Sequence, residues 1–175
     1  MHGRIAPPKD TRFLRWTYRT PDGFSDLVMA SDGLVLTGLN FLGSKDCDKH
    51  CLAGERRDLP VFRETKRWLD VYFGGRQPDF TPPYSMRGIT PFRRDVVDEM
   101  LKIPFGGTVT YGEIARAIAA RRNRKTMSAQ AVGGAVGWNP ICLIVPCHRV
   151  IGTDGSMTGY GGGLENKIAL LALER

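Results

Sequence analysis

A proline-rich segment, residues 77–84, divides this chain of 175 residues near its middle. Three of its eight residues are proline, which fixes the backbone angle φ and removes a backbone donor. Such a segment is predicted to be an extended connector. The chain is therefore predicted to fold as two domains, residues 1–84 and residues 85–175.

The pattern before the connector mixes strands with one helix. Residues 10–20 alternate in the manner of a half-buried strand. Residues 24–30 and 33–41 are two more candidate strands, joined by a Ser-Asp-Gly turn. Residues 60–73 place apolar side chains at helical spacing and are followed by Gly-Gly, which ends a helix. This half is predicted to be a small antiparallel sheet with a helix packed on one face.

The pattern after the connector is helical. A Thr-Pro pair at Thr90 begins a first helix. Thr110 and Glu113 stand at the spacing of a capping box, which begins a second. Ser128 caps a third helix over residues 129–138. Two helices joined by a short turn fit a helix-turn-helix arrangement, so the fold class is α+β with an all-α second domain.

The third of these helices has almost no side chains. Glycine costs helical stability, about 1 kcal/mol relative to alanine, so this composition needs a reason. Close approach to another surface is one reason, and tight packing against a helix inside the protein is another. The small residues are Ala129, Ala131, Gly133, Gly134, Ala135 and Gly137.

A net charge of +7 makes an anionic partner plausible, and nucleic acid is the commonest such partner. Many basic proteins bind no nucleic acid, so the charge alone favours neither the presence nor the absence of nucleic-acid binding. No apolar run approaches the about 20 residues that cross a bilayer, and the first residues lack the apolar core of a secretory signal. We expect a cytoplasmic protein without membrane contact.

Four cysteines are present: Cys47, Cys51, Cys142 and Cys147. In a reducing cytosol they are not expected to form structural disulfides. Cys47 and Cys51, with His50 between them, could be half of a metal site. No second cysteine pair stands at zinc-ligand spacing, so a solvent-facing loop or helix start is favoured and no metal is expected.

The most reactive-looking stretch is Ile-Val-Pro-Cys-His-Arg-Val, residues 144–150. A cysteine that begins a helix is deprotonated more easily, because free backbone N–H groups and the helix dipole stabilise a thiolate. Cys147 is therefore predicted to be a nucleophile. A cysteine hydrolase that uses Cys147 with a histidine is an alternative. Neighbouring residues on a helix rarely face each other, which disfavours Cys147 and His148 as its dyad.

Five local signals agree, in order and spacing, with one family. They are Thr110-Tyr111-Gly112-Glu113, Ala131-Val132-Gly133-Gly134-Ala135, Asn139-Pro140, Pro146-Cys147-His148-Arg149-Val150 and Gly159-Tyr160-Gly161-Gly162-Gly163. Together they resemble the methylated-DNA–protein-cysteine methyltransferases, also called O6-alkylguanine-DNA alkyltransferases. The resemblance is dense over residues 90–175 and only architectural before them. It implies a ribonuclease-H-like first domain and a winged-helix-like helix-turn-helix in the second.

The resemblance also implies a function. The family repairs duplex DNA by flipping out O6-alkylguanine and moving the alkyl group to a cysteine, here Cys147, so each molecule acts once. Repair of O4-alkylthymine is left open. No organic cofactor takes part, and we expect a monomer whose partner is double-stranded DNA. The alternative is a non-catalytic, alkyltransferase-like protein that binds damaged DNA. Such relatives lack the cysteine, so Cys147 argues against it.

Four residues match the catalytic positions of the family. Besides Cys147, His148 resembles the base that takes the thiol proton through a water. Glu174 matches the carboxylate that orients this histidine. Tyr111 matches a tyrosine that donates toward the base and crowds the DNA backbone to promote flipping. The neighbouring Arg149 is more often a structural salt-bridge partner in the family.

Further residues match the base-binding positions of the family. Asn139 matches a hinge that ties the recognition helix to the active-site segment, although an Asn-Pro turn can also merely stop a helix. The carbonyls of Cys147 and Val150 would accept from the guanine amino group. The loop at Tyr160 and Gly161 would face the alkylated oxygen.

The recognition helix of the family lies along the minor groove of DNA, where bulky side chains would obstruct it. Ser128, Ala129 and Gln130 begin the corresponding helix here. Many members have arginine at the position of Gln130, where it fills the gap left by the flipped base. Many also have serine at the position of Gly161. Glutamine can fill the same gap but brings no charge.

A basic loop precedes the recognition helix. Our hypothesis is that it supplies the phosphate attraction that Gln130 cannot, since each neutralised phosphate adds to the salt dependence of binding. A loop that is merely solvated is the simpler alternative. The basic residues are Arg121, Arg122, Arg124 and Lys125.

Overall fold

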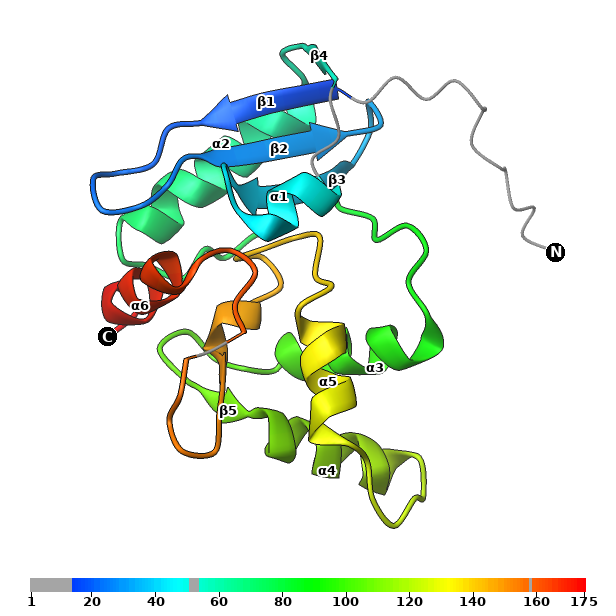
Figure 1. Ribbon diagram of the computed structural model, residues 1–175. Coiled ribbons are helices and arrows are strands. Elements are labelled where there is room, and N and C mark those ends of the chain that lie inside the picture. Colours follow the sequence, from blue (N-terminus) through cyan, green and yellow to red (C-terminus); the bar gives the residue numbers. More distant parts are fainter. Residues whose placement is uncertain (1–13, 51–53, 158) are drawn as a thin grey trace, which may run out of the picture.

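The computed structural model describes residues 14–50, 54–157 and 159–175 of the chain. A sheet with the strand order β3-β2-β1-β4 forms the upper half of the molecule (Figure 1). β1, β2 and β3 are antiparallel neighbours, whereas β4 runs parallel to β1 and is an addition to the predicted sheet. The strands are β1 (Leu14–Tyr18), β2 (Leu27–Ser31), β3 (Leu36–Phe41) and β4 (Glu55–Arg56). Residues 10–13 of the first predicted strand lie outside the described residues.

Two helices accompany this sheet. The predicted helix is confirmed as α2 (Pro60–Phe73), which packs behind the sheet in Figure 1 and buries Trp68, Leu69 and Tyr72. A second helix, α1 (Lys45–His50), lies beside β3 on the other side. Cys47 lies in the first turn of α1, so the expected helix start is confirmed, but its side chain is buried and does not face solvent. Cys51 lies outside the described residues, and the expectation of no metal there stays a prediction.

Helices dominate the second half, as predicted. Thr90 caps α3, the Thr110–Glu113 capping box begins α4, and Ser128 caps α5. The all-α expectation needs one addition, a short parallel pair of strands on either side of the helix-turn-helix. The elements are α3 (Pro91–Met100), β5 (Val109–Thr110), α4 (Tyr111–Arg121), α5 (Ala129–Val136), the 3-10 turn η1 (Cys147–Arg149), β6 (Val150–Ile151) and α6 (Leu164–Leu173).

The two halves are joined through the edge strand β3. The connector lies along its start, where Leu36 N donates to Pro83 O at 2.9 Å. The segment after α5 pairs further along, with Leu39 N donating to Pro140 O at 2.8 Å and Cys142 N donating to Leu39 O at 2.9 Å. One continuous hydrophobic core therefore runs through both halves. Among the described residues, no helix has the length and apolar character needed to cross a membrane.

Candidate active site

Cys147 lies on a single 3-10 turn, where a longer helix was expected. The turn is only three residues long because Val150 is already extended and pairs with Val109 of β5. A turn this short has too small a dipole to activate a thiol. The Cys147 side chain is also buried, with 3% of its surface exposed. Any activation of this thiol must therefore come from neighbouring side chains.

These neighbours hold the pKa of the Cys147 thiol below its ordinary value. The hydrogen bond with Cys142 lowers this pKa most, and a hydrogen bond from Asn139 Nδ2 to Sγ, 3.1 Å long, lowers it further. The positive charge of Lys167 acts in the same direction. Burial and the negative charge of Asp46 oppose the shift. The net effect is a lowered pKa of the thiol, which makes the thiolate, the nucleophilic form, easier to reach.

The Asn139 side chain does more than stop a helix. Its Nδ2 also donates to Val145 O at 2.8 Å, and its Oδ1 accepts from Ile141 N at 3.0 Å. The residue is buried and lies shortly after Gly137, which caps the end of α5. These bonds tie the end of α5 to the segment that carries Cys147, which is the geometry expected of a hinge.

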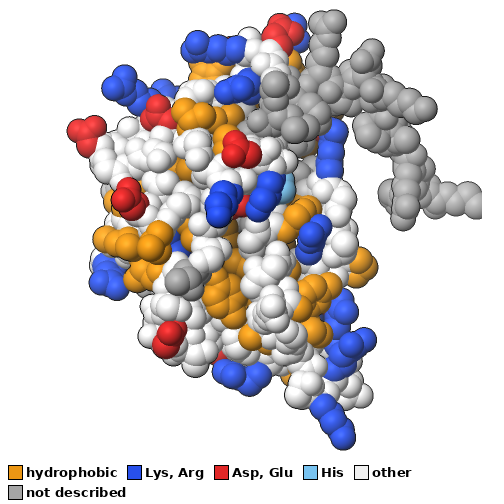
Figure 2. Space-filling view, viewed as in Figure 1, with side chains coloured by type: hydrophobic (Ala, Val, Ile, Leu, Met, Phe, Trp, Pro, Cys, Tyr) orange, Lys and Arg blue, Asp and Glu red, His pale blue; other side chains and the backbone are white. Residues whose placement is uncertain are grey.

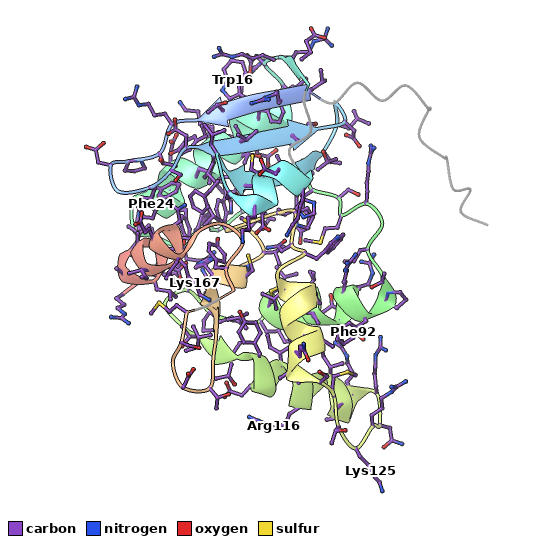
Figure 3. All side chains as sticks on the ribbon, viewed as in Figure 1. Trp16, Phe24, Phe92, Arg116, Lys125 and Lys167 are labelled. Atoms are coloured by element: carbon purple, nitrogen blue, oxygen red, sulfur yellow. The ribbon has the colours of Figure 1, made fainter. Side chains whose placement is uncertain are left out.

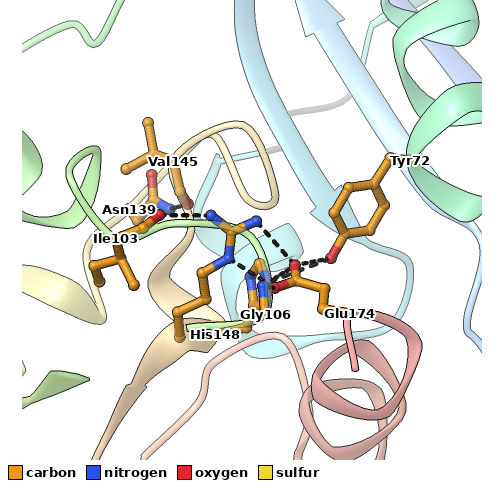
Figure 4. Close-up of polar contacts among 8 residues, drawn as sticks. Tyr72, Ile103, Gly106, Asn139, Val145, His148 and Glu174 are labelled. Atoms are coloured by element: carbon orange, nitrogen blue, oxygen red, sulfur yellow. Dashed lines mark hydrogen bonds and ion pairs between the residues drawn. The ribbon is translucent and has the colours of Figure 1, made fainter. Parts of the chain in front are cut away.

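His148 and Glu174 form a fully buried pair (Figure 4). His148 Nε2 lies 2.7 Å from Glu174 Oε1, and Tyr72 Oη donates to the same oxygen at 2.6 Å. Arg149 donates from Nε to Oε2 at 2.8 Å and from Nη2 to Oε1 at 3.0 Å. Gly106 N donates to Oε2 at 3.0 Å. Arg149 is thus the salt-bridge partner that the sequence predicted.

This network fixes the protonation of the pair. Burial acts to raise the pKa of Glu174, but the hydrogen bonds from His148, Arg149 and Tyr72 outweigh it and hold that pKa far below its usual range. An ionised Glu174 accepts only, so we assign the imidazole proton to Nε2. Burial lowers the pKa of His148, which keeps the ring neutral despite the opposing effect of Glu174.

The other ring nitrogen is available as a proton acceptor. His148 Nδ1 is buried and has no hydrogen-bond partner among the described residues. With the proton on Nε2, Nδ1 carries a free lone pair. The pair therefore presents a base to its surroundings and a carboxylate that can stabilise the imidazolium formed on protonation.

Tyr111 begins α4 and faces both α5 and the glycine-rich loop. A Cβ placed on Gly133 would lie 3.8 Å from its ring, and one placed on Gly159 would lie 3.9 Å from its hydroxyl. Burial, and to a lesser extent the charge of Cys147, raise the pKa of Tyr111. Its hydroxyl therefore stays protonated and can donate.

Lys167 and Tyr160 complete the surroundings of the thiol. Lys167 is fully buried, lies beside the turn in Figure 3, and donates from Nζ to Val150 O at 2.7 Å. Its Nζ is 5.7 Å from the centre of the Tyr160 ring. The Tyr160 hydroxyl is buried without a hydrogen-bond partner in the described part of the chain. It is therefore a polar group that faces the site with its hydrogen-bonding capacity unused.

Gly161 has a steric reason to be glycine. A Cβ at this position would collide with the Asp46 carboxylate of α1, and Asp46 N also donates to Gly161 O at 3.4 Å. The glycine-rich loop and α1 together enclose a cavity of about 590 Å³. Figure 2 shows apolar side chains exposed between the two halves on this face of the molecule. An acidic side chain thus occupies the space of the family's frequent serine.

The start of α5 presents the face expected for DNA. Ser128 Oγ accepts from Ala131 N at 3.2 Å, and Ser128, Ala129 and Gln130 are exposed. A Cβ on Gly134 would meet nothing within 4 Å, so this glycine leaves an open surface. Val132, Ala135 and Val136 are buried on the opposite face. The buried face is packed inside the protein, as one explanation of the small residues requires. The close approach of another surface to the open face stays a prediction.

The basic loop is divided between two roles. Arg121 and Arg122 form ion pairs with acidic side chains of α3, among them Asp95. Arg124 and Lys125 are exposed and make no ion pair with any described residue. Lys125 lies at the tip of the loop (Figure 3). The hypothesis of four phosphate-binding residues is therefore reduced to two, because the other pair is neutralised within the protein.

Known proteins with similar sequences decide the family. The chain is 42% identical over 159 residues to the methylated-DNA–protein-cysteine methyltransferase of Mycobacterium tuberculosis, covering 90% of this chain and 92% of that protein. The chain belongs to the methylated-DNA–protein-cysteine methyltransferase family. It is 47% identical over 149 residues to the member from Methanosarcina acetivorans, covering 85% of this chain and 90% of the other.

Domain models and solved structures agree with this family. Residues 14–85 match the model of the "6-O-methylguanine DNA methyltransferase, ribonuclease-like domain", and residues 91–175 match that of its "DNA binding domain". The crystal structure of Mycobacterium tuberculosis OGT in complex with DNA has a TM-score of 0.77 and 40% identity, with 92% of each chain covered. The predicted fold class is therefore confirmed.

Several residues at the site of this family member were not predicted from its sequence. Tyr72 and Asp46 come from the first half, and Lys167 comes from a helix that was not expected. Tyr72 lies within residues 60–73, whose apolar spacing predicted only a helix, and no local pattern connects it with a residue 102 positions away. The lysine carried a weak signal, since it stands one turn after a glycine-rich loop that had already been singled out.

Proposed function

We propose that this protein repairs O6-alkylguanine in duplex DNA by transferring the alkyl group to Cys147 in a single turnover. Membership of the methyltransferase family supports DNA repair by alkyl transfer. The observation that carries the proposal is the thiol itself, which is buried and accepts a hydrogen bond from Asn139 beside a histidine whose Nδ1 is free.

Alkyl transfer begins with the loss of the thiol proton. The Cys147 thiol gives its proton to His148 Nδ1, through one water in the family, while Glu174 stabilises the imidazolium. The thiolate attacks the alkyl carbon, so that a C–S bond forms as the C–O6 bond breaks. The bonding electrons stay on the guanine, which takes up one proton and becomes ordinary guanine. The thioether is stable, so the protein is consumed.

Tyr111 and the backbone near the turn would hold the flipped base. The Tyr111 hydroxyl donates to the departing guanine and stabilises its negative charge. The Val150 carbonyl already accepts from Lys167 at 2.7 Å, and its second lone pair remains for the guanine amino group, as does that of the Cys147 carbonyl. Tyr160 and Gly161 face the alkylated oxygen, with Asp46 beside them in place of a serine.

The bare face of α5 would lie in the minor groove. Ser128, Ala129 and Gln130 are exposed there, and Gln130 would fill the space of the flipped base. Arg124 and Lys125 would neutralise neighbouring phosphates. We further propose that residues 1–84 and 85–175 are the two domains and that the protein acts as a monomer, with O4-alkylthymine as a second substrate to be tested.

Intact mass measurement tests this proposal. After incubation with a duplex that contains O6-methylguanine, each molecule should gain about one methylene, located on Cys147. The Cys147→Ala variant should bind the duplex without any gain. An unchanged mass of the wild type at stoichiometric DNA would favour the alternative, a non-catalytic protein that binds damaged DNA. Multiple turnovers of an ester or peptide would favour a hydrolase.

A further inference from the structure

Tyr72 connects the first half of the chain to the His148–Glu174 pair. It lies on α2 and is fully buried. Its hydroxyl donates to Glu174 Oε1 at 2.6 Å and lies 3.3 Å from His148 Nε2 (Figure 4). The hydroxyl therefore contacts His148 Nε2 and Glu174 Oε1, the two atoms that form the hydrogen bond of the pair.

The Tyr72 ring is held in place by aromatic neighbours. Trp68 stacks on it with 5.3 Å between ring centres, and Phe73 and Phe105 meet it edge to face at 5.5 and 5.9 Å. The ring thus has no room to swing away from Glu174. Burial and the neighbouring charge of Glu174 raise the pKa of Tyr72 well above its usual range, so the hydroxyl can only be neutral and a donor toward Glu174.

Three donors meet at one carboxylate oxygen. Oε1 accepts from Tyr72 Oη at 2.6 Å, from His148 Nε2 at 2.7 Å and from Arg149 Nη2 at 3.0 Å. A carboxylate oxygen that is already bonded to one donor attracts the proton of a second donor less strongly. The Tyr72 hydroxyl thus reduces the pull of Glu174 on the imidazole, and a weaker pull favours the neutral form of His148.

We propose that Tyr72 is a positioning residue for alkyl transfer, which holds Glu174 and keeps His148 neutral so that Nδ1 can accept the Cys147 proton. This inference rests on the proposed function, because it assigns a role within the same reaction. It also gives the first half of the chain a part in the chemistry, beyond its part in the fold.

The other groups that face the pair act consistently with this role. From η1, Arg149 lowers the pKa of His148 by its positive charge, and Cys147 lies on the same turn. From α6, Lys167 also lowers it, whereas Glu174 raises it. From the glycine-rich loop, the neutral Tyr160 lies within electrostatic range of Tyr72. Glu174 is therefore the one group among these that opposes the neutral imidazole, and Tyr72 bonds directly to it.

The Tyr72→Phe variant tests the proposal. It keeps the ring and removes the donor, so Glu174 stabilises the imidazolium more strongly and the pKa of His148 rises. A protonated His148 cannot accept the thiol proton. The acid limb of the single-turnover rate on an O6-methylguanine duplex should therefore move to higher pH by about half to one unit. Just below the wild-type limb, the rate should fall about 3- to 10-fold.

The Tyr18→Phe variant is a matched control. Tyr18 is also buried in the first half, packs against Phe73, and donates to a carboxylate, that of Asp70, at 2.9 Å. Removal of its hydroxyl should lower stability in the same way but leave the pH profile unchanged. An equal shift of the profile in both variants would reduce Tyr72 to a structural role.

NMR titration of His148 provides a readout that does not depend on repair. The signal is assigned with a His148→Gln variant, and its pKa should be higher in Tyr72→Phe than in the wild type. Site-specific 3-fluorotyrosine at position 72 is a stronger donor that keeps the shape, so it should lower the pKa of His148 even if Tyr72→Phe does not fold. An unchanged titration in both proteins overturns the inference. If the pKa of His148 shifts as expected but the wild type transfers no methyl group, the proposed function is contradicted and the role of Tyr72 toward His148 is not.

Discussion

Glu174→Gln should be among the most damaging single substitutions in this protein. Glu174 is the only described carboxylate that bonds to Arg149, whose side chain is 6% exposed and whose other bond is to the Ile103 carbonyl. Glutamine would leave this guanidinium buried without a negative partner. Removal of one member of a buried ion pair costs about 3–5 kcal/mol. For a chain of 175 residues, at about 2–4 °C per kcal/mol, the melting temperature should fall by about 6–20 °C.

Calorimetry and urea unfolding at pH 7 would measure this loss. Glu165→Gln makes the same chemical change on the exposed face of α6 and should shift the melting temperature by less than about 2 °C. Adding Arg149→Met to Glu174→Gln should restore part of the stability, because it removes the unpaired charge. A loss below about 1 kcal/mol in Glu174→Gln would refute the reasoning, since it would mean that Arg149 finds water or another partner.

The same pair predicts a pH dependence with a definite sign. The folded-state pKa of Glu174 lies below its ordinary value of 4.5. The stabilisation is therefore complete above that value and is lost as the pH falls toward the folded pKa. Wild-type stability should decline below about pH 4.5, whereas Glu174→Gln should decline less steeply over the same range. Parallel declines would show that other carboxylates govern acid unfolding.

Two further predictions concern the glycine-rich loop and the basic loop. Gly161→Ser should lower stability by about 1–3 kcal/mol and slow methyl transfer, because its side chain displaces the Asp46 carboxylate. Adding Asp46→Ala to Gly161→Ser should restore stability. An equal loss of stability with and without Asp46→Ala would contradict the collision between residue 161 and the Asp46 carboxylate. The double variant Arg124→Ala/Lys125→Ala should flatten the slope of log K against log salt by about 2. The variant Arg121→Ala/Arg122→Ala should leave this slope unchanged and lower stability. A slope that changes in this variant but not in Arg124→Ala/Lys125→Ala would mean that Arg121 and Arg122 bind the phosphates.

Much of the local structure could be predicted from short stretches of sequence. The capping box at Thr110 and Glu113, the cap at Ser128 and the apolar spacing of residues 60–73 each depend on neighbours within one or two turns. For the same reason the order of motifs around Cys147 was enough to suggest the family. These features are fixed by contacts between residues that are close in the chain.

The environment of the thiol was decided only by the tertiary structure. The sequence placed Cys147 at a helix start, but pairing of Val150 with Val109 leaves one 3-10 turn, and Asn139 and Cys142 lower the thiol pKa instead. Tyr72 reaches Glu174 across 102 positions of the chain. The spacing of apolar residues and the helix-capping residues report only local structure, and they do not indicate such distant partners. The amino-acid sequence thus predicted which atom reacts. The packing of the two halves decided which groups shift the pKa of that thiol and which groups surround it.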